Sequence, residues 1–455
     1  MNRISLTKNV LTASLMMLPF SLVAGDAPGY FKIPGTDTTL KIYGFAELNG
    51  VYDMGTHNSD IDDFDWASFL PVQPFDHPVP GVQSATTKNN SLYMTARTSR
   101  FGFTTTTPSD MGPITMKLEA DFNSPSPSNF SSPTTTNGNT CRIRQAYGQV
   151  GGFLFGQTWT TMFDGDSLPD TVDFNAVPSA TLLRIPMLQY TFKVGSKSSL
   201  AVAAEFPFNR MFQGASGHVV SQDAGEGYGG DAYQDIPDLH ANWTYSDGWG
   251  HVSLRGVMLT YKTGGNQVLT GVGTNTTTQG SINSTGFGGA LSGHFNIAKD
   301  TVVWSVMGGN GVGRYLFGDI LQSAINDGHQ INLWKGLGWH VGYTHVWDAK
   351  WRSNLIYSEV SNTDPGAYNG QTLNKWMQSS ANPNYWGADG QPNKTLQNAM
   401  VNTFYQISKT ASCGVEYAWG TRKTFATYTS AGALVNDGNT GTQKRINFVF
   451  HINFF

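Results

Sequence analysis

The segment Ile114–Phe122 reads ITMKLEADF, and its side chains alternate between apolar and polar without a break. Successive side chains of an extended strand point to opposite faces, so all the apolar residues fall on one face. The opposite face carries Thr115, Lys117, Glu119 and Asp121. On a helix the two sets would overlap and bury charge. The segment therefore predicts a strand with lipid on one side and water on the other, which is the unit of a transmembrane β-barrel.

The C-terminal segment repeats this alternation and stops on an aromatic residue. Its apolar face carries Ile446, Phe448, Phe450, Ile452 and Phe454. The last residue, Phe455, is out of phase with that face. A terminal aromatic on an amphipathic strand resembles the assembly signal of bacterial outer-membrane proteins. This resemblance implies that the barrel-assembly machinery is a partner through Phe455.

About sixteen such segments follow one another along the chain, a number typical of large barrels. They begin near Leu40, Ser91, Pro113, Cys141, Phe153, Thr181, Ser198, Pro237, His251, Thr285, Thr301, Gly338, Trp351, Asn398, Ser412 and Gln443. Turns such as Gly151-Gly152 are short, whereas segments such as 54–90 and 362–397 are long and polar. We therefore predict an all-β, transmembrane antiparallel β-barrel with short periplasmic turns and long extracellular loops. An even number of strands places both chain ends in the periplasm.

The first residues predict export from the cytoplasm. Arg3 and Lys8 precede an apolar stretch, residues 10–23, that is too short for a stable membrane span and ends in small residues. We expect residues 1–24 to be a cleaved signal peptide, residues 25–39 a short periplasmic segment and residues 40–455 the barrel. No later run of the sequence reaches the roughly 18 apolar residues of a membrane helix.

Composition and motifs argue against several classes of function. The net charge of -4 offers no basic stripe for nucleic acid. Cys141 and Cys413 lie far apart, so we expect two free thiols, and without CxxC or HExxH spacing we expect neither metal nor cofactor. The histidines lie in no catalytic motif and no Gly-x-Ser-x-Gly occurs, which disfavours an enzyme such as a barrel hydrolase. An adhesin that binds through its long loops is the alternative to a channel.

The candidate pore residues are charged side chains in the lumen phase. Arg142 and Arg144 are two residues apart on one strand, so both point the same way. An arginine cluster concentrates anions and binds carboxylates through paired hydrogen bonds. The alternative is that these arginines only pair with Glu119 and Asp121, and the sequence leaves both possibilities open. Further lumen positions by the same rule are Lys41, Glu47, Lys117, Arg255, Arg352, Glu416 and Arg445.

Two more arginines come from neighbouring segments. Arg100 belongs to the second strand region and Arg184 to the sixth. Pro186 predicts a bulge close to Arg184, because proline is tolerated in a sheet at bulges. The direction of the Arg184 side chain therefore stays open.

Two stretches resemble a known family. Phe31–Phe45 looks like the start of the barrel in DcaP-like outer-membrane porins, and so do Arg142–Val150 and the following Phe155–Trp159. The resemblance implies a sixteen-stranded trimeric porin that takes up small anions such as dicarboxylates. It also implies a Gram-negative outer-membrane location, in contact with lipid and lipopolysaccharide. Some members carry a coiled coil before the barrel, and here only residues 25–30 precede the motif, so none is expected.

The third outer loop completes the expected constriction. In general porins this loop folds inward, and here it runs from Gly156 to Ala180 with Asp164 and Asp166 among its acidic residues. An acidic loop that faces the Arg142/Arg144 wall would set a transverse field across the pore and orient dipolar or zwitterionic solutes. A calcium site at Asp164 is the alternative, although no glutamate closes it at the EF-hand spacing. The acidic run at 60–65 is expected to be a solvated outer loop.

Overall fold

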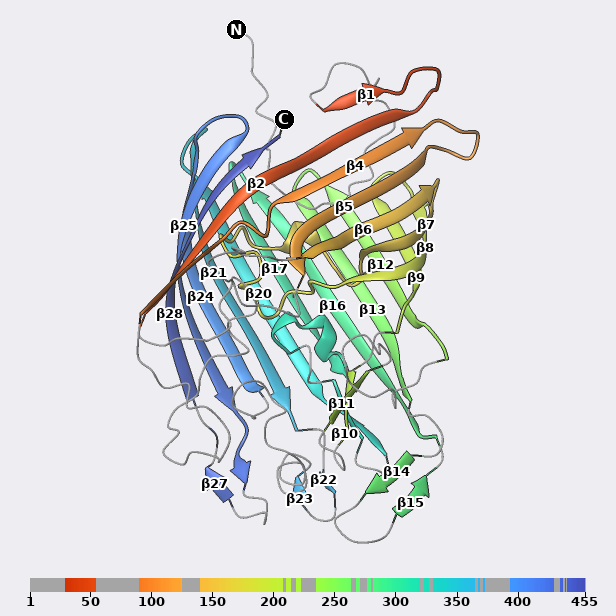
Figure 1. Ribbon diagram of the computed structural model, residues 1–455, viewed down its shortest axis with the longest axis vertical. Coiled ribbons are helices and arrows are strands. Elements are labelled where there is room, and N and C mark those ends of the chain that lie inside the picture. The colour runs from red at the N-terminus through yellow and green to blue at the C-terminus, as the bar shows by residue number, and fades with distance from the viewer. Residues whose placement is uncertain are drawn as a thin grey trace.

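The computed structural model describes the barrel strands, the short turns and parts of the long loops (Figure 1). The described residues are 29–54, 90–124, 140–207, 210–213, 218–221, 235–262, 267–270, 276–279, 281–319, 323–326, 330–364, 367–368, 371–372, 393–428, 434–436, 438 and 440–454. The predicted signal peptide, the acidic run 60–65 and Phe455 lie outside these residues. Within them, no helix is long and apolar enough to cross a membrane.

The predicted fold is confirmed: the chain forms a closed 16-strand antiparallel β-barrel. Its strands are β2 (Thr39–Met54), β3 (Ser91–Thr95) with β4 (Arg100–Thr107), β5 (Ile114–Ser124), β6 (Thr140–Val150), β7 (Phe153–Trp159), β8 (Arg184–Val194), β9 (Ser198–Glu205), β12 (Asp238–Asp247), β13 (Gly250–Lys262), β16 (Asn283–Ile297), β17 (Asp300–Asn310), β20 (Lys335–Val346), β21 (Trp351–Thr363), β24 (Asn393–Gln406), β25 (Ala411–Thr424) and β28 (Thr440–Asn453). The barrel closes where β2 pairs with β28, from Phe45 opposite Asn453 to Met54 opposite Lys444. Closure leaves the main barrel sheet without an unpaired edge.

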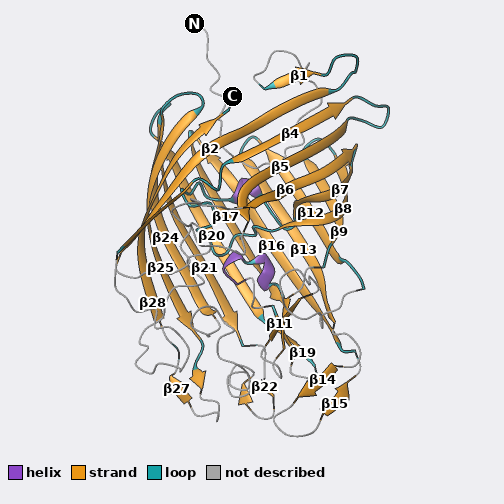
Figure 2. Cartoon of the chain, in the orientation of Figure 1, coloured by secondary structure: helices purple, strands orange, loops and turns teal. Residues whose placement is uncertain are grey.

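The remaining elements are short and lie at the barrel ends or inside it (Figure 2). They are β1 (Tyr30–Lys32), β10 (Arg210–Gln213), β11 (His218–Ser221), β14 (Gln267–Thr270), β15 (Thr276–Gln279), β18 (Ala324–Asn326), β19 (Ile331–Leu333), β22 (Ala367–Tyr368), β23 (Gln371–Thr372), β26 (Thr427–Tyr428), β27 (Leu434–Asn436) and the 3-10 turns η1 (Gly165–Ser167), η3 (Gly313–Tyr315) and η4 (Phe317–Asp319). The 3-10 turns lie inside the ring of strands.

The alternation along β5 sorts its side chains between the outer surface and the interior. Ile114 is 41% exposed and Leu118 is 38% exposed on the outer face, whereas Glu119 and Asp121 are 4% and 1% exposed inside. Since lipid accepts only the apolar face, this pattern fixes which way the strand faces.

The connections show the expected asymmetry. Short turns such as 151–152 and 248–249 lie at the same end of the barrel as the start of β2 and the end of β28, drawn toward the top of Figure 1. The short strands β10, β11, β14, β15, β22, β23 and β27 lie at the opposite end, and they belong to the long connections between barrel strands. We therefore take the upper end of Figure 1 as periplasmic and the lower end as extracellular.

One local expectation was wrong. The pairing of β7 with β8 runs without a register shift through Pro186, so there is no bulge at that residue. The irregularity lies instead between β5 and β6, where Glu119 pairs with Gln145 and Ala120 with Ile143. The expected free thiols are confirmed, since Cys141 and Cys413 form no disulfide.

Candidate pore constriction

A row of charged side chains crosses three adjacent strands on the inner wall. The register places Arg100 of β4 opposite Asp121 of β5, and Asp121 opposite Arg142 of β6. Arg142 donates from Nε and Nη2 to the two oxygens of Asp121, at 2.9 and 2.7 Å. Such a bidentate pair fixes both side chains and leaves the Arg142 guanidinium partly exposed to the lumen.

Arg144 lies at the irregularity between β5 and β6, which adds one residue to β6. Its Nε donates to Glu119 at 2.9 Å and its Nη1 to Asp121 at 2.7 Å. Arg100 and Lys117 each place a nitrogen 3.7 Å from Glu119. Two carboxylates thus face four cations: Arg100, Lys117, Arg142 and Arg144. Arg142 and Arg144 do pair with Glu119 and Asp121, as the alternative interpretation of the sequence predicted. This part of the wall nevertheless keeps a surplus of positive charge.

Arg184 adds to that surplus from the next part of the wall. Its guanidinium lies 4.7 Å from the centre of the Trp159 ring, and the same ring stacks on Phe163 at 4.2 Å. Trp159 thus makes both a cation–π contact with Arg184 and a stacking contact with Phe163. The Nη1 of Arg184 is buried and has no hydrogen-bond partner among the described residues. We call Arg100, Lys117, Arg142, Arg144 and Arg184 the basic wall.

The third outer loop, residues 160–183, folds into the barrel as predicted. Near its start the Asp164 carboxylate meets His251 Nε2 at 2.9 Å and accepts a hydrogen bond from Ser292 Oγ. Burial alone would raise the pKa of Asp164, but the His251 hydrogen bond and the charge of Arg255 lower that pKa to about 2. Asp164 is therefore ionised and tied to β13 and β16.

Further along, the loop follows β20, β21, β24 and β25. Asp170 accepts a hydrogen bond from Arg352 Nε at 2.6 Å. Glu416 accepts from the backbone N–H groups of Val172 and Asp173, at 3.1 and 3.4 Å. These loop contacts lie on strands β13 to β25, whereas the basic wall lies on β4 to β8.

Asp164 and Asp170 of the loop are bound to strands other than those of the basic wall, and the transverse field expected between the loop and that wall stays a prediction. Asp164 binds to β13 and β16 and Asp170 binds to β21, and neither is paired with Arg142 or Arg144. Asp166 lies in η1, two residues after Asp164. Among the residues that the structure describes, no cluster of ligands could hold a metal ion.

One loop carboxyl is held in an unfavourable environment. Burial raises the pKa of Asp173 to about 7, and the nearby Glu416 adds to this effect while Arg445 opposes it. The Asp173 Oδ2 atom is buried without a hydrogen-bond partner in the described part of the chain. The tip of the loop is thus an acidic contact with β25, not a charge presented to the pore.

Six lumen positions need a correction. The side chains of Glu119, Asp121, Arg144, Arg255, Glu416 and Arg445 point inward as their strand phase predicts, but they are buried and not in contact with open water. Arg255 donates to the Met162 carbonyl of the loop, and Glu416 holds the loop tip. Strand phase gives the direction of a side chain and does not show which loop covers it.

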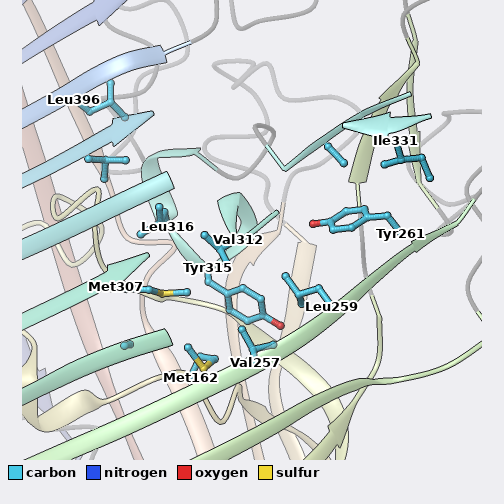
Figure 3. Packing of buried hydrophobic residues seen from close by; sticks show 13 residues of the cluster. Met162, Val257, Leu259, Tyr261, Met307, Val312, Tyr315, Leu316, Ile331 and Leu396 are labelled. Carbon is cyan, nitrogen blue, oxygen red and sulfur yellow. The ribbon is translucent and has the colours of Figure 1, made fainter. Parts of the chain in front are cut away.

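A second inward segment was missed by the sequence reasoning. Residues 311–319, between β17 and β20, pack Val312, Tyr315 and Leu316 against inward residues of β13 and β17 (Figure 3). A signal was available, because the inward positions Val257 and Leu259 are apolar. A wall in contact with water would have polar residues there.

A closed barrel with a loop folded inside it and a charged inner wall defines the class of this protein as an outer-membrane porin. More narrowly, the chain belongs to the porin subfamily, because the model of that family matches residues 27–444. Family and fold are those of channels in the Gram-negative outer membrane and not of enzymes.

Solved structures agree on the fold. The chain is similar to the outer membrane channel DcaP of Acinetobacter baumannii, with 24% identity and a TM-score of 0.68 over 93% of this chain and 99% of that one. It is also similar to a trimer form of OmpT of Vibrio cholerae (12%, TM-score 0.52, 92% and 99%). A third similar structure is an anion-selective porin from Comamonas acidovorans (10%, TM-score 0.50, 92% and 100%). The resemblance seen in the sequence is thereby confirmed. No curated protein matches the chain.

Proposed function

We propose that this porin lets small hydrophilic solutes diffuse passively across the outer membrane and prefers small anions such as dicarboxylates. The observation that carries the proposal is the surplus charge of the basic wall, where four cations meet the carboxylates of Glu119 and Asp121. Arg184 adds a fifth cation with an unused hydrogen-bond donor. In a narrow passage with low-dielectric walls, such a surplus raises the local concentration of anions.

The route of the solute follows from the same arrangement. The loop 160–183 and residues 311–319 occupy the side of the lumen next to β13, β17 and β24. A solute would then pass along the basic wall, with Arg142 nearer the extracellular end and Lys117 nearer the periplasm. Zwitterions with an exposed carboxylate fit the same wall.

The other parts of the proposal concern export and assembly. Residues 1–24 would be removed as a signal peptide, and Phe455 would be read by the barrel-assembly machinery. A homotrimer surrounded by lipid and lipopolysaccharide is supported by the trimer form of a similar porin.

The proposal is tested by the reversal potential of the purified protein in a planar bilayer with a potassium chloride gradient. We expect stepwise currents. We also expect the sign of the reversal potential to show that chloride is more permeant than potassium. Replacing chloride by succinate should leave a measurable anion current. A reversal potential of the sign for potassium preference would overturn the proposed selectivity.

A further inference from the structure

We infer that residues 311–319 form a second constricting segment, and that Arg314 is the positioning residue that holds it, together with the loop 160–183, against one side of the lumen. The inference concerns the width of the pore. It therefore stands whichever ion the basic wall prefers.

The first observation is an apolar core inside the barrel. Val312, Tyr315 and Leu316 are fully buried, and they pack with Met162 of the loop and with Met307 of β17 (Figure 3). Side chains packed in this way exclude water from the space they fill. That part of the lumen is therefore closed to solutes.

The second observation is that the two inward segments are hydrogen-bonded to each other. Thr181 Oγ1 donates to the Tyr315 carbonyl at 2.8 Å. The backbone N–H groups of Phe317 and Gly318 donate to the carbonyls of Ala180 and Pro178, at 3.0 and 2.8 Å. The end of the loop and residues 315–318 thus form one body.

The third observation is the anchor of that body on the wall. Arg314 forms a buried ion pair with Asp238 at the extracellular end of β12 and donates to the Tyr315 hydroxyl. Removing one partner of a buried ion pair leaves the other charge buried without a counter-charge, which is strongly destabilising. The Arg314–Asp238 ion pair therefore strongly stabilises residues 311–319 in their position against the barrel wall.

The polar contacts continue from Arg314 to the start of the loop. The Tyr315 hydroxyl lies 3.3 Å from His240 Nε2, and that nitrogen lies 3.3 Å from a Glu205 oxygen. Glu205 in turn accepts hydrogen bonds from Thr160 Oγ1 at 2.7 Å and from the Thr161 N–H at 2.6 Å. The same network thus reaches both ends of the loop, at Thr160 and, through the Tyr315 carbonyl, at Thr181.

The test is single-channel recording of Arg314→Met in planar bilayers. We expect roughly a doubling of conductance and added open-channel noise, because the undocked segment frees cross-section and moves. Arg314→Lys should recover part of the wild-type conductance, since it keeps the charge opposite Asp238. The reversal potential should stay at the wild-type value, which separates this inference from the proposed anion preference.

Lys262→Met is the matched control. It removes one positive charge from the Lys262–Asp235 pair at the extracellular end of β13, outside residues 160–183 and 311–319. Its conductance should equal that of the wild type. Thr181→Val, which removes one link at nearly constant volume, should shift conductance in the same direction as Arg314→Met by a smaller amount.

Two outcomes would overturn the inference. An assembled Arg314→Met channel with wild-type conductance and noise shows that Arg314 does not position the constriction. If that variant fails to assemble, Thr181→Val decides alone, and wild-type conductance and noise in it count equally against the inference.

Discussion

Replacing Arg142 and Arg144 together by alanine is expected to turn the channel from anion preference toward cation preference. Glu119 and Asp121 would keep their negative charge and lose their closest partners, which lie at 2.7 to 2.9 Å. Arg100, Lys117 and Arg184 would then face these two carboxylates, so the surplus of positive charge on the basic wall would fall from three to one. In a tenfold gradient of a monovalent salt, where full selectivity gives about 59 mV, the reversal potential should move by tens of millivolts.

The matched control is the double replacement of Arg142 and Arg144 by lysine. It keeps both charges but loses the planar fork that binds a carboxylate at two points. Anion preference should therefore persist, while binding of dicarboxylates weakens. Both doubles should fold, because the β5–β6 ladder depends on backbone hydrogen bonds, although the alanine double should be less stable since Glu119 and Asp121 are buried and lose their closest arginine partners. A wild-type reversal potential in the alanine double would place the selectivity filter elsewhere.

The largest loss of stability is expected for Arg445→Ala. Arg445 and Asp53 are both 0% exposed, and Arg445 donates to the two oxygens of Asp53 at 2.7 and 3.2 Å. They join β28 to β2, the strands that close the barrel. Removing the arginine leaves a buried carboxylate without its partner, which costs about 3–5 kcal/mol of unfolding free energy. The measurement is urea unfolding in lipid vesicles, followed by tryptophan fluorescence.

The double variant Asp53→Leu with Arg445→Met separates charge from packing. An apolar pair of similar volume often replaces a buried ion pair without loss, so most of the stability should return. If Arg445→Ala unfolded at the wild-type urea concentration, the pair would not contribute to barrel closure.

The strands could be predicted from the sequence because lipid and water impose opposite demands on alternate residues. The predicted strand starts lie close to the observed ones, with Asn398 against Asn393 the largest difference. Lys117, Arg142 and Arg144 of the basic wall followed from the same phase rule, whereas the direction of the Arg184 side chain was left open. The expectation of a bulge at Pro186 was wrong because a proline at a strand position is compatible with either a bulge or regular pairing.

The interior of the barrel could not be predicted in the same way. Which loops turn inward depends on contacts between segments far apart in the chain, such as Thr181 with Tyr315. The phase rule assigned Arg255 and Glu416 to water although loops cover them. The apolar inward residues Val257 and Leu259 were the clue to the second segment, and a strand with two apolar faces can be recognised in a sequence.

The central claim is that the open path runs along the basic wall and not through the packed side of the lumen. In a background with Cys141 and Cys413 replaced by serine, a single cysteine is placed at Arg142 or at Val257. A water-soluble thiosulfonate reagent is then added during single-channel recording. The account predicts a stepwise drop in current for the cysteine at position 142 and no change for the one at 257. Block at 257 without an effect at 142 would contradict it.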